Sequence, residues 1–373
     1  MPTNSAAVLA SPFADLVVRP APYPAPGPDQ ILIRNRAIAV NPLDSMKQTT
    51  GNMMFGWLPY PTVLGEDVAG EVVGVGSAVT RFREGDRVFA YAVGMEKGSD
   101  HVAEGGFQEV TVVSEALAAP IPDGMAFEDA AVLPLAVSTA ASALFQRDQL
   151  ALRHPGAAVA AGEEGEVVVV WGGSTSVGSN AVQLAVAAGY TVVTTASPHN
   201  HDRMRDLGAT HVVDYASRSA VADLVAAVGG ARVAGLLAVG TGSAEPTVAV
   251  AIATGAKRVS LTSPSVSFDG LPKRGGPSVA LVRIGLRLVA GNVALQARCL
   301  VRGIRTRFVW GSSLRNNEVG PMLWSRFLPE ALAAGGFVAA PTPQVVGHGL
   351  ENVQVALDTL RGGVSARKLV VTL

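Results

Sequence analysis

The stretch from residue 166 to residue 190 constrains the fold of this chain more than any other part of the sequence. It opens with an apolar run at 167–171, which is typical of a strand buried on both faces of a parallel sheet. A turn with Gly172, Gly173 and Gly178 follows, then a helix-periodic segment that starts near Val177, and a second apolar run covers 191–195. This order predicts the start of a strand–helix–strand unit, with an anion site where the helix begins.

A glycine-rich turn between a buried strand and a helix is the arrangement that binds the pyrophosphate of a dinucleotide. Backbone N–H groups and hydroxyls would contact the pyrophosphate at four consecutive positions, Ser174, Thr175, Ser176 and Val177. An ordinary strand–helix connection could contain the same glycines. The complete order of strand, turn and helix favours the dinucleotide over that alternative.

The residues after the second strand indicate which dinucleotide binds. Folds that prefer NAD usually place an Asp or Glu there, on the ribose hydroxyls. Here the chain reads TASPHNHDR over 195–203, without a carboxylate at the tip of the strand. Hydrogen-bond donors for a 2′-phosphate are Ser197, His199 and Asn200, with Arg203 as a further candidate. Ser197 or Asn200 could also start the next helix. We therefore expect NADPH.

Composition excludes several classes of function. A chain of 373 residues with 49% apolar and 16% charged residues is long enough for two domains and leaves little room for disorder. A net charge of −1 gives no electrostatic basis for binding nucleic acid or an anionic membrane. The single cysteine, Cys299, rules out an internal disulfide and suits a cytoplasmic protein.

No segment is a convincing targeting or membrane sequence. The N-terminus lacks a basic stretch ahead of an apolar core, so it is a poor signal peptide. The most membrane-like segment, 279–295, is short for a span and contains Arg283 and Arg287. We expect it to form a buried or pocket-lining amphipathic helix, and we expect no association with a membrane.

The pattern of elements changes along the chain. Residues 1–135 contain short apolar runs separated by Gly, Pro and Asp turns, which predicts a β-rich, barrel-like domain. A helix is expected over 130–145, and strands and helices then alternate to about residue 310, as in a doubly wound parallel sheet. The last part, 311–373, would complete the first domain, with a ligand in the cleft between the two.

Three motifs occur in the order found in the medium-chain dehydrogenase/reductases: AVNPLDSMKQTTG (39–51), PTVLGEDVAGEVVGVGSAVTRFREGDRV (61–88) and the glycine-rich turn. The chain resembles that superfamily over nearly its whole length. Its details are similar to the zinc-free enoyl and quinone reductases, especially the fungal trans-acting enoyl reductases of polyketide pathways: WGGSTSVG (171–178), ASPHN (196–200), FVWGSSLRNNEVG (308–320) and GGVSARKLVV (362–371). The resemblance implies an α/β protein with a GroES-like catalytic domain, a Rossmann cofactor domain and a role in secondary metabolism.

Where zinc-dependent relatives carry a Cys and a Gly-His-Glu, this chain has other residues. They are Asn41, Asp44 and Ser45 in the first region and Gly65-Glu66-Asp67 in the second. The four cysteines of the structural zinc lobe are also missing, and the six histidines are dispersed. Glu66 and Asp67 could in principle hold a cation, although a hydrogen-bonded turn is the favoured role. We expect no metal.

Without a Lewis acid, the reaction that the resemblance implies is hydride transfer from NADPH to an activated C=C bond. Lys47 would reach the nicotinamide ribose or stabilise enolate charge, and its alternative is a solvated surface lysine. Thr139, placed at the start of a long helix, would contact the nicotinamide or simply satisfy backbone. Asn41 and Asp44 would line the same cleft or cap a turn. No proton donor stands out, since core roles are favoured for the tyrosines of this domain, Tyr60 and Tyr91, and water could supply the proton.

The resemblance implies further contacts. Tyr215 would pack by the adenosine, or serve as a core aromatic. Leu261 and Thr262 would pass the nicotinamide carboxamide, and Val364 and Ser365 would close over the cofactor.

The substrate would be a small or carrier-bound unsaturated carbonyl compound. One wall of its pocket is expected in 263–300, with a basic rim from Lys273, Arg274, Arg298 and Arg302 for a thioester-carried substrate. A quinone reductase and an NADPH-binding adaptor without turnover are the alternative functions. The protein is expected to be a monomer or homodimer.

Overall fold

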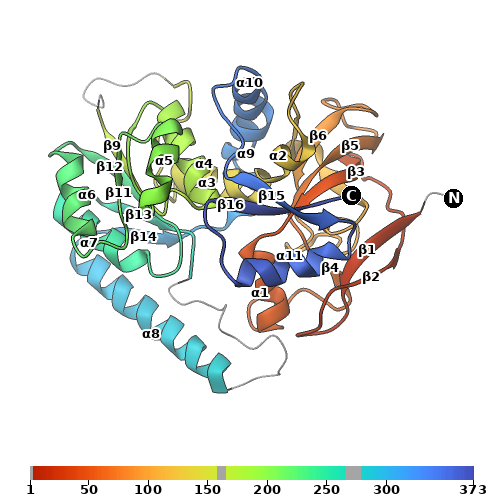
Figure 1. Ribbon diagram of the computed structural model, residues 1–373, viewed down its shortest axis with the longest axis horizontal. Helices are drawn as coiled ribbons and strands as arrows, with labels where there is room; N and C mark the ends of the chain where they lie inside the picture. The colour runs from red at the N-terminus through yellow and green to blue at the C-terminus, as the bar shows by residue number, and fades with distance from the viewer. Residues whose placement is uncertain (1–2, 158–164, 265–278) are drawn as a thin grey trace. The chain divides into compact units, whose positions relative to one another are not determined.

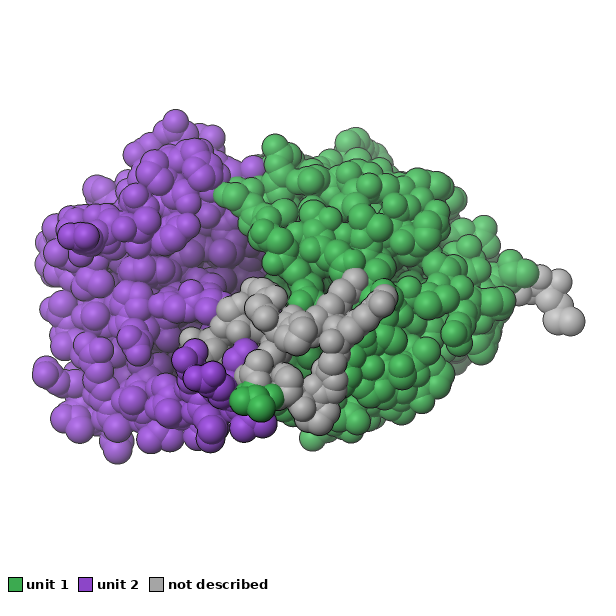
Figure 2. All heavy atoms as spheres, turned by 60° about the horizontal axis from the view of Figure 1, so that its bottom comes forward, with its two compact units in different colours: residues 1–135, 268–281, 320–373 green, residues 136–267, 282–319 purple. Residues whose placement is uncertain are grey.

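The computed structural model describes residues 3–157, 165–264 and 279–373. The chain divides into two compact units, coloured separately in Figure 2. Unit 1 comprises residues 1–135, 268–281 and 320–373, and unit 2 comprises residues 136–267 and 282–319. Unit 2 is therefore made from the middle of the chain, whereas unit 1 takes both ends.

Unit 1 is mainly antiparallel. In its described part, a three-stranded sheet has the order β2 (Val17–Ala21), β1 (Asn4–Leu9), β4 (Thr62–Val63). A seven-stranded sheet contains, in spatial order, β15 (Thr342–His348), β16 (Arg367–Thr372), β3 (Gln30–Ala39), β5 (Asp67–Val75), β6 (Arg87–Tyr91) and β8 (Ala118–Pro120), with β7 (Val110–Ser114) also paired to β3. The two ends of the chain meet in this sheet, because β16 pairs antiparallel with β3 through Val371 and Ile38.

The helices of unit 1 connect or cover these strands. They are α1 (Pro42–Thr50), α2 (Phe127–Ala131), α9 (Val319–Pro321), a π-helical turn (Met322–Phe327), α10 (Leu328–Ala333) and α11 (Asn352–Arg361), with one short 3₁₀ turn at Glu115–Leu117. Helix α1 follows β3 directly, so the Asn-Pro-x-Asp segment stands between a central strand and a helix.

Unit 2 is built on a six-stranded parallel sheet, visible in Figure 1. The spatial order is β11 (His211–Val213), β10 (Thr191–Thr195), β9 (Val167–Trp171), β12 (Val233–Ala238), β13 (Arg258–Leu261) and β14 (Arg305–Phe308). The strand order reverses between β9 and β12. In open α/β sheets, ligands bind beyond the carboxyl ends of the strands at such a reversal. The predicted α/β class with a doubly wound sheet is confirmed.

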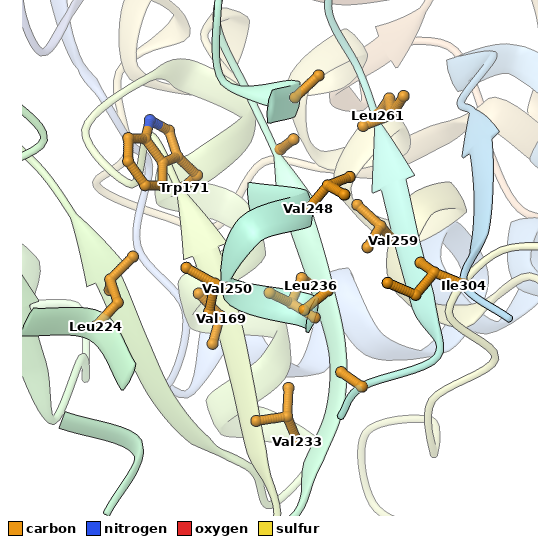
Figure 3. Packing of buried hydrophobic residues seen from close by; sticks show 14 of the residues in the cluster. Val169, Trp171, Leu224, Val233, Leu236, Val248, Val250, Val259, Leu261 and Ile304 are labelled. Carbon is orange, nitrogen blue, oxygen red and sulfur yellow. The ribbon is translucent and has the colours of Figure 1, made fainter. Parts of the chain in front are cut away.

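The helices of unit 2 alternate with its strands. They are α3 (Pro134–Phe145), α4 (Ser176–Ala187), α5 (His201–Asp206), α6 (Ala220–Val228), α7 (Ala244–Thr254) and α8 (Val279–Val301), with 3₁₀ turns at Pro198–Asn200 and Gly311–Asn316. All five residues of β9 are buried, as the apolar run predicts. Figure 3 shows Val169 and Trp171 of β9 in one cluster with Leu236, Val248 and Val259.

Helix α8 differs from its predicted role. Two described segments are long and apolar enough to cross a membrane, but residues 127–145 are 78% buried and residues 282–301 only 11% buried. Of the two alternatives for 279–295, a buried or a pocket-lining helix, the buried one is therefore wrong, because Leu295 is the only buried side chain among those described in this range. Further along α8, Cys299 is also buried. The predicted wall with Lys273 and Arg274 lies outside the described residues.

Candidate cofactor and catalytic site

The glycine-rich turn joins β9 to α4 at the carboxyl end of the sheet. Helix α4 begins at Ser176, one residue before the predicted position, and Thr175 is its N-cap. The Thr175 hydroxyl accepts a hydrogen bond from the Gly178 N–H at 3.0 Å and donates one to the Gly172 carbonyl at 2.7 Å. Because the first N–H groups of a helix lack intrahelical acceptors, those of Ser176 and Val177 suit an anion at this end.

Gly178 lets α4 approach the turn closely. A Cβ at this position would lie 2.1 Å from the carbonyl oxygen of Gly172 and 2.8 Å from the Cα of Gly173, so only glycine fits. The Ser179 hydroxyl donates to the Gly173 carbonyl at 3.0 Å and fixes the same turn from behind. Ser174 lies in the turn itself, so the four predicted pyrophosphate residues run from the turn through the N-cap into the first turn of α4.

A pocket of about 320 Å³ opens beyond the carboxyl ends of β9, β11 and β12. Its lining includes Trp171, Tyr215, Ser217, Arg218, Thr241 and Pro246. The Ser197 hydroxyl donates to the Tyr215 hydroxyl at 3.3 Å, so these two predicted cofactor residues come together at the pocket. The pocket lies at the strand-order reversal, where a ligand of this sheet is expected.

Arg218 is a pocket residue that the sequence interpretation missed. It lies exposed in the loop between β11 and α6, three residues after Tyr215. The sequence interpretation named Arg203 instead, which the structure places in α5. A basic residue in the loop after β11, the strand beside β10, is the sequence signal that could have identified Arg218.

The other residues predicted after β10 are arranged less uniformly. Ser197 and Asn200 occupy N-cap positions of the 3₁₀ turn and of α5, but neither side chain makes a capping hydrogen bond. Asn200 is buried and His199 is exposed. The two residues therefore stand at the starts of these helical segments, as the alternative role predicts, but their side chains do not cap them.

The residues predicted near the nicotinamide belong to two elements of unit 2. Leu261 is buried in the core, and the hydroxyl and N–H of Thr262 both donate to the Ala238 carbonyl, at 3.1 and 3.0 Å. Thr139 is buried in the middle of α3, so its predicted place at the start of the helix is wrong. The helix begins earlier because Pro134 opens it.

In unit 1, the Asn-Pro-x-Asp segment forms a buried polar network. Asp44 accepts hydrogen bonds from the N–H of Asn41 at 2.7 Å and from the N–H of Gly65 at 3.2 Å. The side-chain NH₂ of Asn41 donates to Asp67 at 2.8 Å, and the Lys368 ammonium donates to the side-chain oxygen of Asn41. Lys368 also forms an ion pair with Asp67 at 2.8 Å. Asn41 and Asp44 thus do cap a turn, as the alternative role proposed.

Lys47 lies outside this network and is completely buried. Its ammonium donates to the Asn52 side chain at 3.0 Å and to the carbonyls of Phe55 at 2.9 Å and Leu58 at 3.2 Å. The nitrogen is also 4.3 Å from the centre of the Tyr60 ring. A lysine has three N–H donors, and all three are used here. The alternative of a solvated surface lysine is therefore wrong, and burial lowers the pKa of Lys47 to about 8.

The last two predicted cofactor residues, Val364 and Ser365, lie in the loop between α11 and β16 of unit 1. Three residues further along the chain, Lys368 enters β16 and joins the buried network. The loop is thus anchored at its C-terminal end.

Comparisons with known proteins agree with this architecture. Residues 27–123 match the alcohol dehydrogenase GroES-like domain. The chain is 46% identical over 375 residues to the dehydrogenase pigH of Monascus ruber, with 100% of both chains covered. The chain belongs to the medium-chain dehydrogenase/reductase family. It is also 39% identical over 345 residues to the trans-enoyl reductase himH of Aspergillus japonicus, covering 92% of this chain and 89% of the relative. The structure of the CurK enoyl reductase shares the fold, with a TM-score of 0.72, 17% identity and 99% of each chain covered.

Membership of the medium-chain dehydrogenase/reductase family makes this chain an oxidoreductase with a nicotinamide cofactor. The residues of unit 2 fit such a cofactor. The tight approach at Gly178 and the N-terminus of α4 suit a pyrophosphate, and the aromatic side chains of Trp171 and Tyr215 suit an adenosine. The β9–α4 turn would therefore hold the pyrophosphate of the dinucleotide, and the pocket would hold its adenosine.

The positions that hold zinc in other members of the medium-chain dehydrogenase/reductase family have a different chemistry here. Asp67 is committed to Lys368, to Asn41 and, at 2.6 Å, to the Leu135 N–H. Among the described residues, no group of three or more His, Cys, Asp and Glu side chains could hold a metal ion. The Lys368 ammonium binds both Asn41 and Asp67 in this network.

Glu66, which directly precedes Asp67 of the network, has an unusual environment. It is fully buried, and neither carboxylate oxygen has a hydrogen-bond partner. Burial, together with the charge of Asp44, raises its pKa well above the ordinary value of 4.5. Burial also raises the pKa of Asp44 to about 7. Burial therefore favours the protonated form of Glu66.

We predict that Glu66→Gln makes the protein more stable relative to wild type as the pH rises. A carboxyl with a raised folded-state pKa contributes its full stability below the unfolded value of about 4.5. It loses about 1.4 kcal/mol per pH unit above that value until the folded pKa is reached. Glutamine does not titrate, so the variant should lose less stability than wild type as the pH rises above about 5, as measured by urea unfolding. Asp44 leaves a residual slope of the same sign up to about pH 7.

The exposed Glu84→Gln is the control for this measurement, and its pH slope should equal that of wild type. Equal slopes for wild type and Glu66→Gln would show that Glu66 titrates normally in the folded protein.

Proposed function

We propose that this member of the medium-chain dehydrogenase/reductase family is an NADPH-dependent, zinc-independent reductase of activated C=C bonds in α,β-unsaturated carbonyl compounds. The observation that carries the proposal is the closed network of Asn41, Asp67 and Lys368 where zinc-dependent members place metal ligands. Such a network stabilises the fold but offers no donor set for a Lewis acid. The name of the relative himH, a trans-enoyl reductase, supports a C=C substrate.

The pocket of unit 2 supports the preference for NADPH. Its lining contains a guanidinium, Arg218, and no carboxylate. A guanidinium forms strong charge-assisted hydrogen bonds with a phosphate, whereas a carboxylate would repel it. Ser197 and Tyr215 add hydroxyl groups at the same place. Arg218 would hold the 2′-phosphate, with these hydroxyls as further donors.

These residues indicate what the cofactor and the protein would each contribute to the reaction. When bound, the cofactor would supply hydride to the β-carbon of the substrate, and water would supply the proton that the α-carbon takes up. The N–H groups of Ser176 and Val177 would hold the pyrophosphate, and the hydrogen-bonded turn would fix the position of the cofactor. The activity would therefore depend on how the protein positions the cofactor, and the close packing of Gly178 against the β9–α4 turn would set that position.

The first test is oxidation of NADPH and of NADH in the presence of an enal, an enone, a 2-enoyl thioester and a quinone, each with and without a chelator. We expect reduction of the enal, enone or thioester that prefers NADPH and resists the chelator. Turnover with the quinone alone would identify a quinone reductase. Tight NADPH binding without turnover on any acceptor would indicate a non-catalytic adaptor.

In the same assay, Arg218→Ala should raise the KM for NADPH by about 10- to 100-fold, because one charge-assisted contact is lost, and should leave the KM for NADH nearly unchanged. The matched control is Arg205→Ala, which removes an exposed arginine that pairs with Asp202 in the same helix. An equal effect of Arg218→Ala on both cofactors would contradict the assignment of the 2′-phosphate.

A further inference from the structure

Helix α8 presents an apolar face that is exposed among the described residues. Large apolar side chains recur along it at spacings of four, three, four and seven residues, which places them on one side of a helix. Each is between 59% and 81% exposed. We call this face the apolar stripe, and it consists of Val282, Leu286, Val289, Val293 and Leu300. Solvent exposure of so many large apolar groups in one row marks an interaction surface.

The opposite side of α8 fixes the helix to unit 2. Leu295 and Cys299 are buried in the core cluster of the parallel sheet, together with Ile304 just after the helix. Figure 1 shows the C-terminal half of α8 beside the sheet and the N-terminal half extending beyond it. The helix cannot cross a bilayer without removing Leu295 and Cys299 from this core. The stripe can therefore contact a surface, but it is not a transmembrane span.

Charge around the stripe is of one sign. Residues 279–317 carry seven arginines and no Asp or Glu, although the whole chain has a net charge of −1. Three of these arginines belong to the helix, Arg283, Arg287 and Arg298, and all three are exposed. Beyond the helix, exposed arginines continue at 302, 305 and 307. The net charge thus conceals a strongly basic segment, and that net charge was one of the two grounds for expecting no membrane contact.

We propose that the apolar stripe docks α8 onto an anionic lipid bilayer, with the helix lying in the plane of the interface. An amphipathic helix with apolar residues on one face and arginines beside them binds in this way, because the apolar side chains enter the acyl boundary and the guanidinium groups meet lipid phosphates. A second copy of the chain fits less well. Two such helices would bring arginines together with no carboxylate on either helix to pair with them.

The test is sedimentation of the full-length protein with vesicles. One set is an equal mixture of phosphatidylcholine and phosphatidylserine, and the other is phosphatidylcholine alone. We expect binding to the anionic vesicles, with at least about tenfold weaker binding to the neutral ones and in high salt. The double variant Leu286→Glu and Val293→Glu should reduce binding to anionic vesicles by at least about tenfold. Its melting temperature should match wild type, since both side chains are exposed.

The matched control is Val355→Glu, which adds a carboxylate at an exposed apolar position of α11 and should leave vesicle binding unchanged. Arg283→Gln with Arg287→Gln should weaken binding to anionic vesicles only. Failure of wild type to sediment with either vesicle overturns the proposal. So does a double Glu variant that binds as well as wild type. A wild-type dimer that ignores vesicles and becomes monomeric in the double variant would assign the stripe to self-association instead. None of these results depends on reductase activity.

Discussion

Replacing Asp67 by asparagine is expected to lower the free energy of unfolding of unit 1 by about 3–5 kcal/mol. The asparagine has nearly the same shape but no charge, so the Lys368 ammonium, which is only 4% exposed, would lose its counter-charge inside the protein. The acceptors for Asn41 and for the Leu135 N–H would also be weakened. Urea unfolding followed by the fluorescence of Trp57 and Trp324, both in unit 1, measures the change.

Two further variants separate charge from packing. Glu71→Gln breaks an ion pair with Arg36 whose side chains are 37% and 42% exposed, so it should cost less than about 1 kcal/mol. Adding Lys368→Met to Asp67→Asn removes the unpaired ammonium and should recover part of the loss. If Asp67→Asn proves as mild as Glu71→Gln, Lys368 must find another counter-charge, and the network does not depend on this pair.

Replacing Gly178 by alanine is expected to lower the free energy of unfolding of unit 2 by about 2–4 kcal/mol and to weaken NADPH binding at least about tenfold. The added Cβ would meet the Gly172 carbonyl oxygen at 2.1 Å, and this oxygen belongs to the backbone of the turn. Relief requires α4 to move away, which removes the Thr175 cap and displaces the N–H groups that would bind the pyrophosphate. Thermal unfolding and calorimetric titration with NADPH measure the two effects.

The matched control is Gly285→Ala in α8. This glycine is also helical, but an added Cβ would meet nothing within 4 Å. Alanine is the better helix former, so this variant should be neutral or more stable by up to about 1 kcal/mol, with unchanged NADPH binding. Equal behaviour of the two variants would mean that the turn tolerates displacement of α4.

The sequence predicts unit 2 well because its signals are local. The apolar run of β9, the glycines of the turn and the periodicity of α4 are contiguous, and the predicted helix start differs by one residue from the observed one. The network of unit 1 is less predictable. Asn41 and Asp44 are recognisable as a turn, but Lys368 joins them from the other end of the chain through the pairing of β16 with β3. No local pattern contains that contact.

Helix α8 and Lys47 show a second limit of sequence interpretation. In α8 both sides carry apolar residues, and periodicity does not show which side packs against the sheet. The charge of Lys47 favours a solvent-exposed side chain. In the structure, the carbonyls of Phe55 and Leu58 instead accept hydrogen bonds from its ammonium inside the protein. Both outcomes depend on tertiary packing.

The place of Lys368 in the chain has a consequence for synthesis on the ribosome. All of unit 2 precedes β16 along the chain, and β16 lies between β3 and β15 in the larger sheet of unit 1. During translation, the first 135 residues therefore emerge with residues 37–39 of β3 lacking their β16 partners, although β7 already pairs with residues 30–34 of β3. Asp67 also lacks its ammonium partner until the last strand appears. Unit 2 can complete its parallel sheet before that time. We expect the nascent chain to fold from the middle outwards, with the N-terminal segment dependent on chaperones until the C-terminal strand arrives.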